Sequence, residues 1–190
     1  MTCGTEPTAV QSTGPIEIAE DHMADKIKAK VGDIFQMPID DTRVGYGQVV
    51  VQPERKVLFV CAFAATTRPG EQPDLNVILR SEILLAGNTF DAKIWHGHWP
   101  VVGNLPPNMG TIVLPNYKEG LPGQALVESL DRTRRRRATI DEERLLPFRL
   151  YVAPVGFEKA LKALFGIGEW LADDEDLRYD RVRQSGLIVI

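Results

Sequence analysis

The sequence has little cysteine and no long hydrophobic run. Its two cysteines, Cys3 and Cys61, lie far apart, one near the terminus and one within an apolar stretch. A structural disulfide is therefore not expected, and this cysteine usage is typical of a reducing compartment. No stretch approaches the roughly 20 apolar residues of a membrane span, and no basic region followed by an apolar one opens the chain. We therefore expect a cytoplasmic protein without a membrane partner.

An excess of positive charge is also missing. Lys and Arg total 22 while Asp and Glu total 26, which gives a net charge of −4 and an isoelectric point near 5.4. Binding of nucleic acid through a broad basic field is not expected, because phosphate contacts need concentrated positive charge. A mildly acidic protein instead attracts basic partners.

What the sequence does contain indicates a compact, turn-rich globular protein. Hydrophobic residues make up 44% of its 190 residues, and 16 glycines and 13 prolines favour turns and short strands. Residues 1–22 show no periodicity and are expected to form a flexible N-terminal extension. Residues 23–190 are expected to form a single domain, and Met23 is either an alternative start or an internal methionine.

Alternating apolar residues predict strands at 31–39 and 44–51, joined as a hairpin. The apolar run at 56–65 predicts a buried strand, and shorter strands are expected at 110–114 and 187–190. Apolar residues on one helical face predict a helix at Gly156–Phe165, and the Thr139–Glu142 stretch fits a capping box for a short helix before Pro147. The expected fold is α+β and mainly β: a bent antiparallel sheet or partly open barrel, with the C-terminal helix packed on it.

Candidate catalytic or metal-binding residues are few. On a strand, His96 and His98 would face the same side and could share a divalent metal, with Trp95 and Trp99 packed on the other side. No further Cys or His cluster completes such a site, and no nucleophile turn or phosphate-binding loop is found. We therefore expect no metal, no cofactor and no enzymatic activity.

Two charged clusters stand out. The run Arg132–Arg137 either binds nucleic acid or an acidic partner, or it is a solvated loop. No aromatic residue is interleaved for base stacking, and we favour the loop. The second cluster is acidic and is either a solvated helix start or a partner-binding site with aromatic anchors. We favour partner binding, with these candidate contact residues: Trp170, Asp173, Asp174, Glu175, Asp176 and Tyr179.

Several short motifs resemble the immunity protein 26 family of bacterial polymorphic toxin systems. They are Lys30–Phe35 and Tyr46–Val49, which resemble the opening hairpin of that family, and Trp99–Asn104, which resembles its tryptophan-plus-glycine element. Proline-containing segments follow at Leu105–Pro107 and at Leu114–Pro115. The resemblance is clearest over Lys26–Asn116. It implies a mainly β protein that acts by binding and has no catalytic residues.

The resemblance predicts an immunity protein that binds and neutralises a cognate bacterial toxin by protein–protein interaction. Two alternatives stay open on the sequence alone. One is a cytosolic binding module of unrelated role, and the other is a metal-dependent hydrolase that uses His96 and His98.

Overall fold

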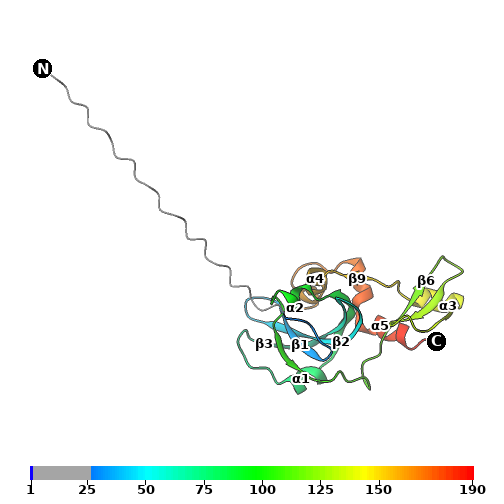
Figure 1. Cartoon of the computed structure of the whole chain (residues 1–190), viewed down its shortest axis with the longest axis horizontal. Coiled ribbons are helices and arrows are strands. Elements are labelled where there is room, and N and C mark those ends of the chain that lie inside the picture. The colour runs from blue at the N-terminus through cyan, green and yellow to red at the C-terminus, as the bar shows by residue number, and fades with distance from the viewer. Residues whose placement is uncertain (2–26) are drawn as a thin grey trace.

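Two β-sheets dominate the computed structural model, which describes Met1 and residues 27–190 (Figure 1). The expected extension at residues 1–22, apart from Met1, and the choice at Met23 lie outside the described residues. The larger sheet has six strands in the order β5-β1-β2-β3-β4-β9. These strands are β1 (Asp33–Pro38), β2 (Val44–Glu54), β3 (Val57–Thr67), β4 (Ile83–Phe90), β5 (Val101–Asn104) and β9 (Tyr151–Val152).

The six-stranded sheet is mixed, which corrects the expectation of a purely antiparallel one. The predicted hairpin is confirmed, because β1 pairs antiparallel with β2 from Ile34 to Pro38. β4 and β9 run parallel, since the chain reaches β9 by a long crossover from the end of β4 and not by a tight turn. The sheet ends at β5 on one side and β9 on the other, so within the described residues neither sheet closes into a barrel.

The smaller sheet is antiparallel and contains β6 (Asn116–Glu119), β7 (Leu126–Ser129) and β8 (Arg135–Arg137). The strands expected at 110–114 and 187–190 are absent from the structure. Their backbone groups bind side chains instead of strand neighbours: the Val113 amide donates to the Tyr179 hydroxyl, and the Ile188 carbonyl accepts from Asn116. Backbone groups satisfied in this way do not pair in a ladder.

Short helices pack around the sheets. The predicted capping box is confirmed, because the Thr139 side chain accepts from the Glu142 amide and the helix ends before Pro147. The helix predicted at Gly156–Phe165 is confirmed as α4. It begins two residues earlier and ends one residue earlier than predicted. The helices are α1 (Leu75–Arg80), α2 (Ala92–Trp95), α3 (Ile140–Leu145), α4 (Pro154–Leu164), the 3-10 helix η1 (Ala172–Leu177) and α5 (Tyr179–Gly186).

Both faces of the larger sheet are buried. On β3, Leu58 and Val60 belong to one apolar cluster while Phe59 and Cys61 belong to the other, because successive side chains point to opposite faces. α4 covers the first face and α1 contributes Ile78 to the second, and Figure 1 shows these helices on opposite sides of the sheet. Burial on two sides explains why the 56–65 segment is almost continuously apolar.

Gly47 lies where the hairpin must pass close to an aromatic ring. A Cβ atom at this position would lie 2.5 Å from Cζ of Phe35, so a larger residue would displace the ring. Its neighbour Tyr46 is buried.

A buried carboxylate joins α4 to the body of the sheet. Glu158 accepts hydrogen bonds from Nε1 of Trp99 at 3.0 Å and from Nζ of Lys162 at 2.9 Å, and it pairs with Lys93. The Trp99 ring is 1% exposed and stacks on Phe35 of β1, with ring centroids 5.0 Å apart. Trp99 thereby adds a polar link between α4 and β1 to the apolar packing of Phe157 and Leu161 in the same cluster.

We predict that Trp99→Ala lowers the free energy of unfolding by about 3–5 kcal/mol, because it opens a cavity and removes a hydrogen bond to Glu158. Urea unfolding measures the change. His98→Ala, at an exposed neighbouring position, is the control and shifts stability by less than about 0.5 kcal/mol. Equal stability of the two variants would contradict the burial of this ring.

Glu158 also predicts a pH dependence of stability. Burial would raise the pKa of its carboxyl, but hydrogen bonds from Lys93, Trp99 and Lys162 outweigh burial and lower the pKa below 4.5. A lowered pKa stabilises the fold above the pKa of the unfolded chain, and this contribution is lost as the pH falls. The stability advantage of wild type over Glu158→Gln should therefore be constant at neutral pH and shrink below about pH 4.5. An advantage that persists unchanged at low pH would contradict the prediction.

Candidate functional site

The two histidines do not lie on a strand, which corrects the expected geometry. His96 caps the C-terminus of α2 and His98 follows in a turn, because the 92–95 segment is helical. Both are exposed, with ring centroids 6.4 Å apart. Within the described part of the chain, no group of three or more His, Cys, Asp or Glu side chains is placed to hold a metal ion. Trp99 is buried as predicted, whereas Trp95 is only half-buried.

The arginine run is largely exposed as expected, but its second half forms strand β8, and Arg132, Arg135 and Arg136 are ion-paired within the protein. Glu128 on β7, whose side chain is 5% exposed, lies 2.6 Å from Arg135 and 2.8 Å from Arg149. Burial would raise the pKa of Glu128, but these arginines lower it. Arg136 pairs with Glu142 at 2.6 Å and brings the pKa of that carboxyl to about 2. These arginines are occupied within the protein, so the run is a structural element of the smaller sheet.

The predicted acidic site lies on and around η1. We call residues 169–180 the acidic segment. Four of its six carboxylates have partners within the protein. Asp174 accepts from the Leu171 amide at 2.9 Å, and Glu175 accepts from Nε1 of Trp170 at 2.7 Å. Asp176 and Asp180 form longer ion pairs with nearby arginines, at 3.7 Å and 3.4 Å. Glu169 and Asp173 are exposed and have no hydrogen bond or ion pair with another described residue. The unengaged negative charge of the segment is therefore concentrated on these two residues.

The two aromatic residues of the acidic segment are half-buried. Trp170 packs against the apolar cluster on the α4 side of the larger sheet. The Tyr179 hydroxyl donates to the Thr111 carbonyl and accepts from the Val113 amide, both at 3.0 Å. Each ring therefore fixes the segment to the body of the protein as well as presenting surface to solvent.

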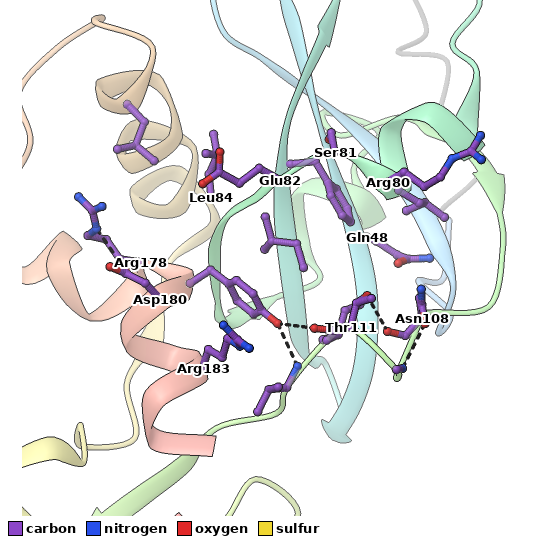
Figure 2. A pocket seen from close by; sticks show the side chains of 18 residues that line it. Gln48, Arg80, Ser81, Glu82, Leu84, Asn108, Thr111, Arg178, Asp180 and Arg183 are labelled. Atoms are coloured by element: carbon purple, nitrogen blue, oxygen red, sulfur yellow. Dashed lines mark hydrogen bonds and ion pairs between the residues drawn. The ribbon is translucent and has the colours of Figure 1, made fainter. Parts of the chain in front are cut away.

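Tyr179 also lines a cleft of about 750 Å³, which we call the α1–α5 cleft (Figure 2). One wall comes from the end of α1, the start of β4 and the 108–113 loop, and the other comes from the end of α4 and the start of α5. Phe63 and Ile112 are its buried apolar lining residues, and Gln48 is its buried polar one. Charged side chains from both walls surround the opening: Arg80, Glu82, Arg178, Asp180 and Arg183.

The comparisons with known proteins decide the family. The family model of immunity protein 26 matches residues 30–123. Across these residues the chain belongs to the immunity protein 26 family. No curated protein and no solved structure gives a match.

Immunity protein 26 members are immunity proteins of polymorphic toxin systems and are generally non-enzymatic, so membership implies a cognate toxin as partner. The resemblance stated from the hairpin and the Trp99–Asn104 motif is confirmed. Non-enzymatic family membership weighs against the hydrolase alternative. No described helix has the length and apolar character needed to cross a bilayer, and the cytoplasmic location stays a prediction.

The immunity protein 26 match ends within the loop between β6 and β7, so the acidic segment lies outside it. The α1–α5 cleft combines both parts, because Gln48 to Val113 belong to the matched residues while Leu164 to Arg183 do not. Sequence reasoning missed this cleft. The available signal was Gln48 itself, an amide side chain within the otherwise apolar stretch of β2.

We predict that Tyr179→Phe loosens the 111–113 loop at the edge of the cleft, because both hydrogen bonds of the hydroxyl are lost. Exchange of the Val113 amide should become about five- to tenfold faster, as expected for a loss of about 1 kcal/mol. Tyr151→Phe is the matched control, since its hydroxyl contacts Glu54 and Arg132 far along the chain from this loop. Unchanged exchange at Val113 in Tyr179→Phe would contradict the role of the hydroxyl.

Proposed function

We propose that this immunity protein neutralises its toxin by stoichiometric protein–protein binding and carries out no chemistry on it. The observation that supports this proposal most strongly is membership of the immunity protein 26 family. A long-lived complex needs surface charge that speeds encounter and a few desolvated side chains that slow release.

We further propose that the acidic segment belongs to the contact surface. Its candidate residues are those expected from the sequence: Trp170, Asp173, Asp174, Glu175, Asp176 and Tyr179. Supporting this choice, Asp173 and Glu169, four residues earlier, are exposed and unpaired within the described residues. Unneutralised carboxylates on a surface raise the rate at which a basic partner arrives.

The proposed roles of these residues differ because their internal contacts differ. Asp174 and Glu175 hold the backbone and the Trp170 indole in place. Asp176 is 3.7 Å from Arg181, which partly neutralises it. Asp173 and Glu169 therefore provide the steering charge, and the half-buried rings of Trp170 and Tyr179 provide apolar contact at its edge.

The test is charge reversal restricted to the unpaired carboxylates, which leaves the internal contacts intact. We predict that Glu169→Lys combined with Asp173→Lys slows association with the toxin encoded by the neighbouring gene by about tenfold at low salt. The difference should shrink as salt is raised, because exposed charges are screened. Stopped-flow association at two salt concentrations measures both effects, and co-expression scores survival.

Asp41→Lys combined with Asp141→Lys is the matched control. Both positions are exposed and lie far from the acidic segment in the sequence, and Asp141 makes only an exposed pair with Arg144. If both double variants associate equally fast, the acidic segment is not the steering surface. If wild type does not bind the toxin at all, neutralisation by direct binding is wrong.

A further inference from the structure

We propose that the α1–α5 cleft receives one aromatic side chain with a neutral hydrogen-bond donor, a tyrosine or a tryptophan, from the toxin. This inference rests on the proposed function, because the side chain would come from the toxin. It is based on an unpaired oxygen atom of Gln48, a residue that lines the cleft together with apolar side chains.

Gln48 is 1% exposed and uses only half of its amide group. Its Nε2 donates to the Leu105 carbonyl at 2.8 Å, whereas its Oε1 has no hydrogen-bond partner among the described residues. Buried polar atoms in proteins are nearly always paired, so this oxygen calls for an explanation. Because the Nε2 contact fixes the amide orientation, the unpaired group is an acceptor and its missing partner must be a donor.

Asn88 offers an internal comparison. Its Oδ1 is also buried and unpaired, but the pocket beside it measures only about 20 Å³. Such a space is enough for about one water molecule, which would satisfy the oxygen. Gln48 lines a cleft of about 750 Å³, within the size range of ligand-binding sites, so one water cannot fill the space next to it.

The walls of the cleft select an apolar occupant. Phe63 and Ile112 are buried, and Leu79 and Ile83 are partly buried beside them. An occupant that contacts these side chains and also donates to Gln48 must combine a large apolar body with one polar hydrogen. Tyrosine and tryptophan side chains have this combination, and both are enriched among the residues that dominate binding energy at interfaces.

The charges around the opening disfavour a cationic donor. Figure 2 shows Arg80 on one side of the cleft and Arg178 and Arg183 on the other. Asp180 pairs with Arg178 at 3.4 Å. The remaining charges at the opening are one carboxylate, Glu82, and two arginines, Arg80 and Arg183, so the opening carries net positive charge. A lysine or arginine entering here would meet like charge and would lose hydration beside a neutral amide. A neutral donor avoids both penalties.

Small aromatic probes test the donor requirement without the toxin. The full chain is titrated with 4-methylphenol and with 4-fluorotoluene, which has nearly the same shape and no donor, while backbone amide shifts are followed by NMR. We expect both probes to shift amides of the 79–84 and 108–113 segments, with 4-methylphenol binding about tenfold more tightly, as expected for one hydrogen bond. In Gln48→Met this preference should vanish, and Gln36→Met, a Gln on β1 outside the cleft, should retain it.

Equal affinity of the two probes for wild type, or shifts confined to other segments, would overturn the inference. Because Gln48→Met also removes the bond to Leu105, a second variant blocks the cleft from an exposed position. Thr111→Trp should abolish the shifts, whereas Lys159→Trp on the exposed face of α4 should not. Probe binding that survives Thr111→Trp would place the probe elsewhere and would also overturn it.

The toxin complex separates this inference from the proposed function. We expect Thr111→Trp to weaken toxin binding by about thirtyfold or more, in line with loss of an interface hot spot, and Lys159→Trp to leave binding unchanged. If Thr111→Trp binds normally while Glu169→Lys with Asp173→Lys associates slowly, the cleft inference fails and the proposed function stands. If wild type does not bind the toxin, the proposed function fails and the cleft assignment to a toxin side chain fails with it.

Discussion

The carboxylate of Glu158 is the contact on which the placement of the C-terminal third depends. It accepts hydrogen bonds from Trp99, which stacks on β1, and from Lys162 one helical turn away. Helix α4 is followed directly by η1 and α5, so the position of α4 sets where the acidic segment and one wall of the α1–α5 cleft lie. A buried charge of this kind is tolerated only when several donors surround it. Glu158 therefore joins the family-matched sheet to the elements that follow it, together with the β4–β9 pairing and the hydrogen bonds of Tyr179.

Burial of the larger sheet on both faces explains where a binding surface can exist. α4 covers one face, while α1, the 108–113 loop, α5 and the smaller sheet cover the other only in part. The α1–α5 cleft remains between α1 and α5, and Tyr179 ties its edge by bonding to both Thr111 and Val113. The 108–113 loop, which is held by the Tyr179 hydrogen bonds, gives one side of the cleft a preformed shape. The acidic segment on the other side provides long-range charge. Preformed surfaces of this kind bind with less loss of conformational entropy.

Local patterns predicted the local elements well, but long-range contacts could not be read from them. Alternation in 31–51 and the helical spacing of Phe157 and Leu161 correctly indicated the hairpin and α4, and the capping box at Thr139 was visible as a motif. The geometry assigned to His96 failed because a helical turn replaced a strand. The ion pairs of the arginine run were missed because Glu128 lies on the neighbouring strand β7. The cleft was missed because Gln48 and Tyr179, which both line it, are brought to it only by tertiary packing.

We propose that neutralisation occurs through direct contact of the toxin with the surface formed by the acidic segment and the α1–α5 cleft. Hydrogen exchange tests this contact when it is measured by mass spectrometry for the protein alone and for the protein with its toxin. Direct contact should slow exchange in residues 169–183, 79–84 and 108–113 and leave exchange in the smaller sheet unchanged. Protection confined to β6–β8, or no protection anywhere in the chain, would contradict it.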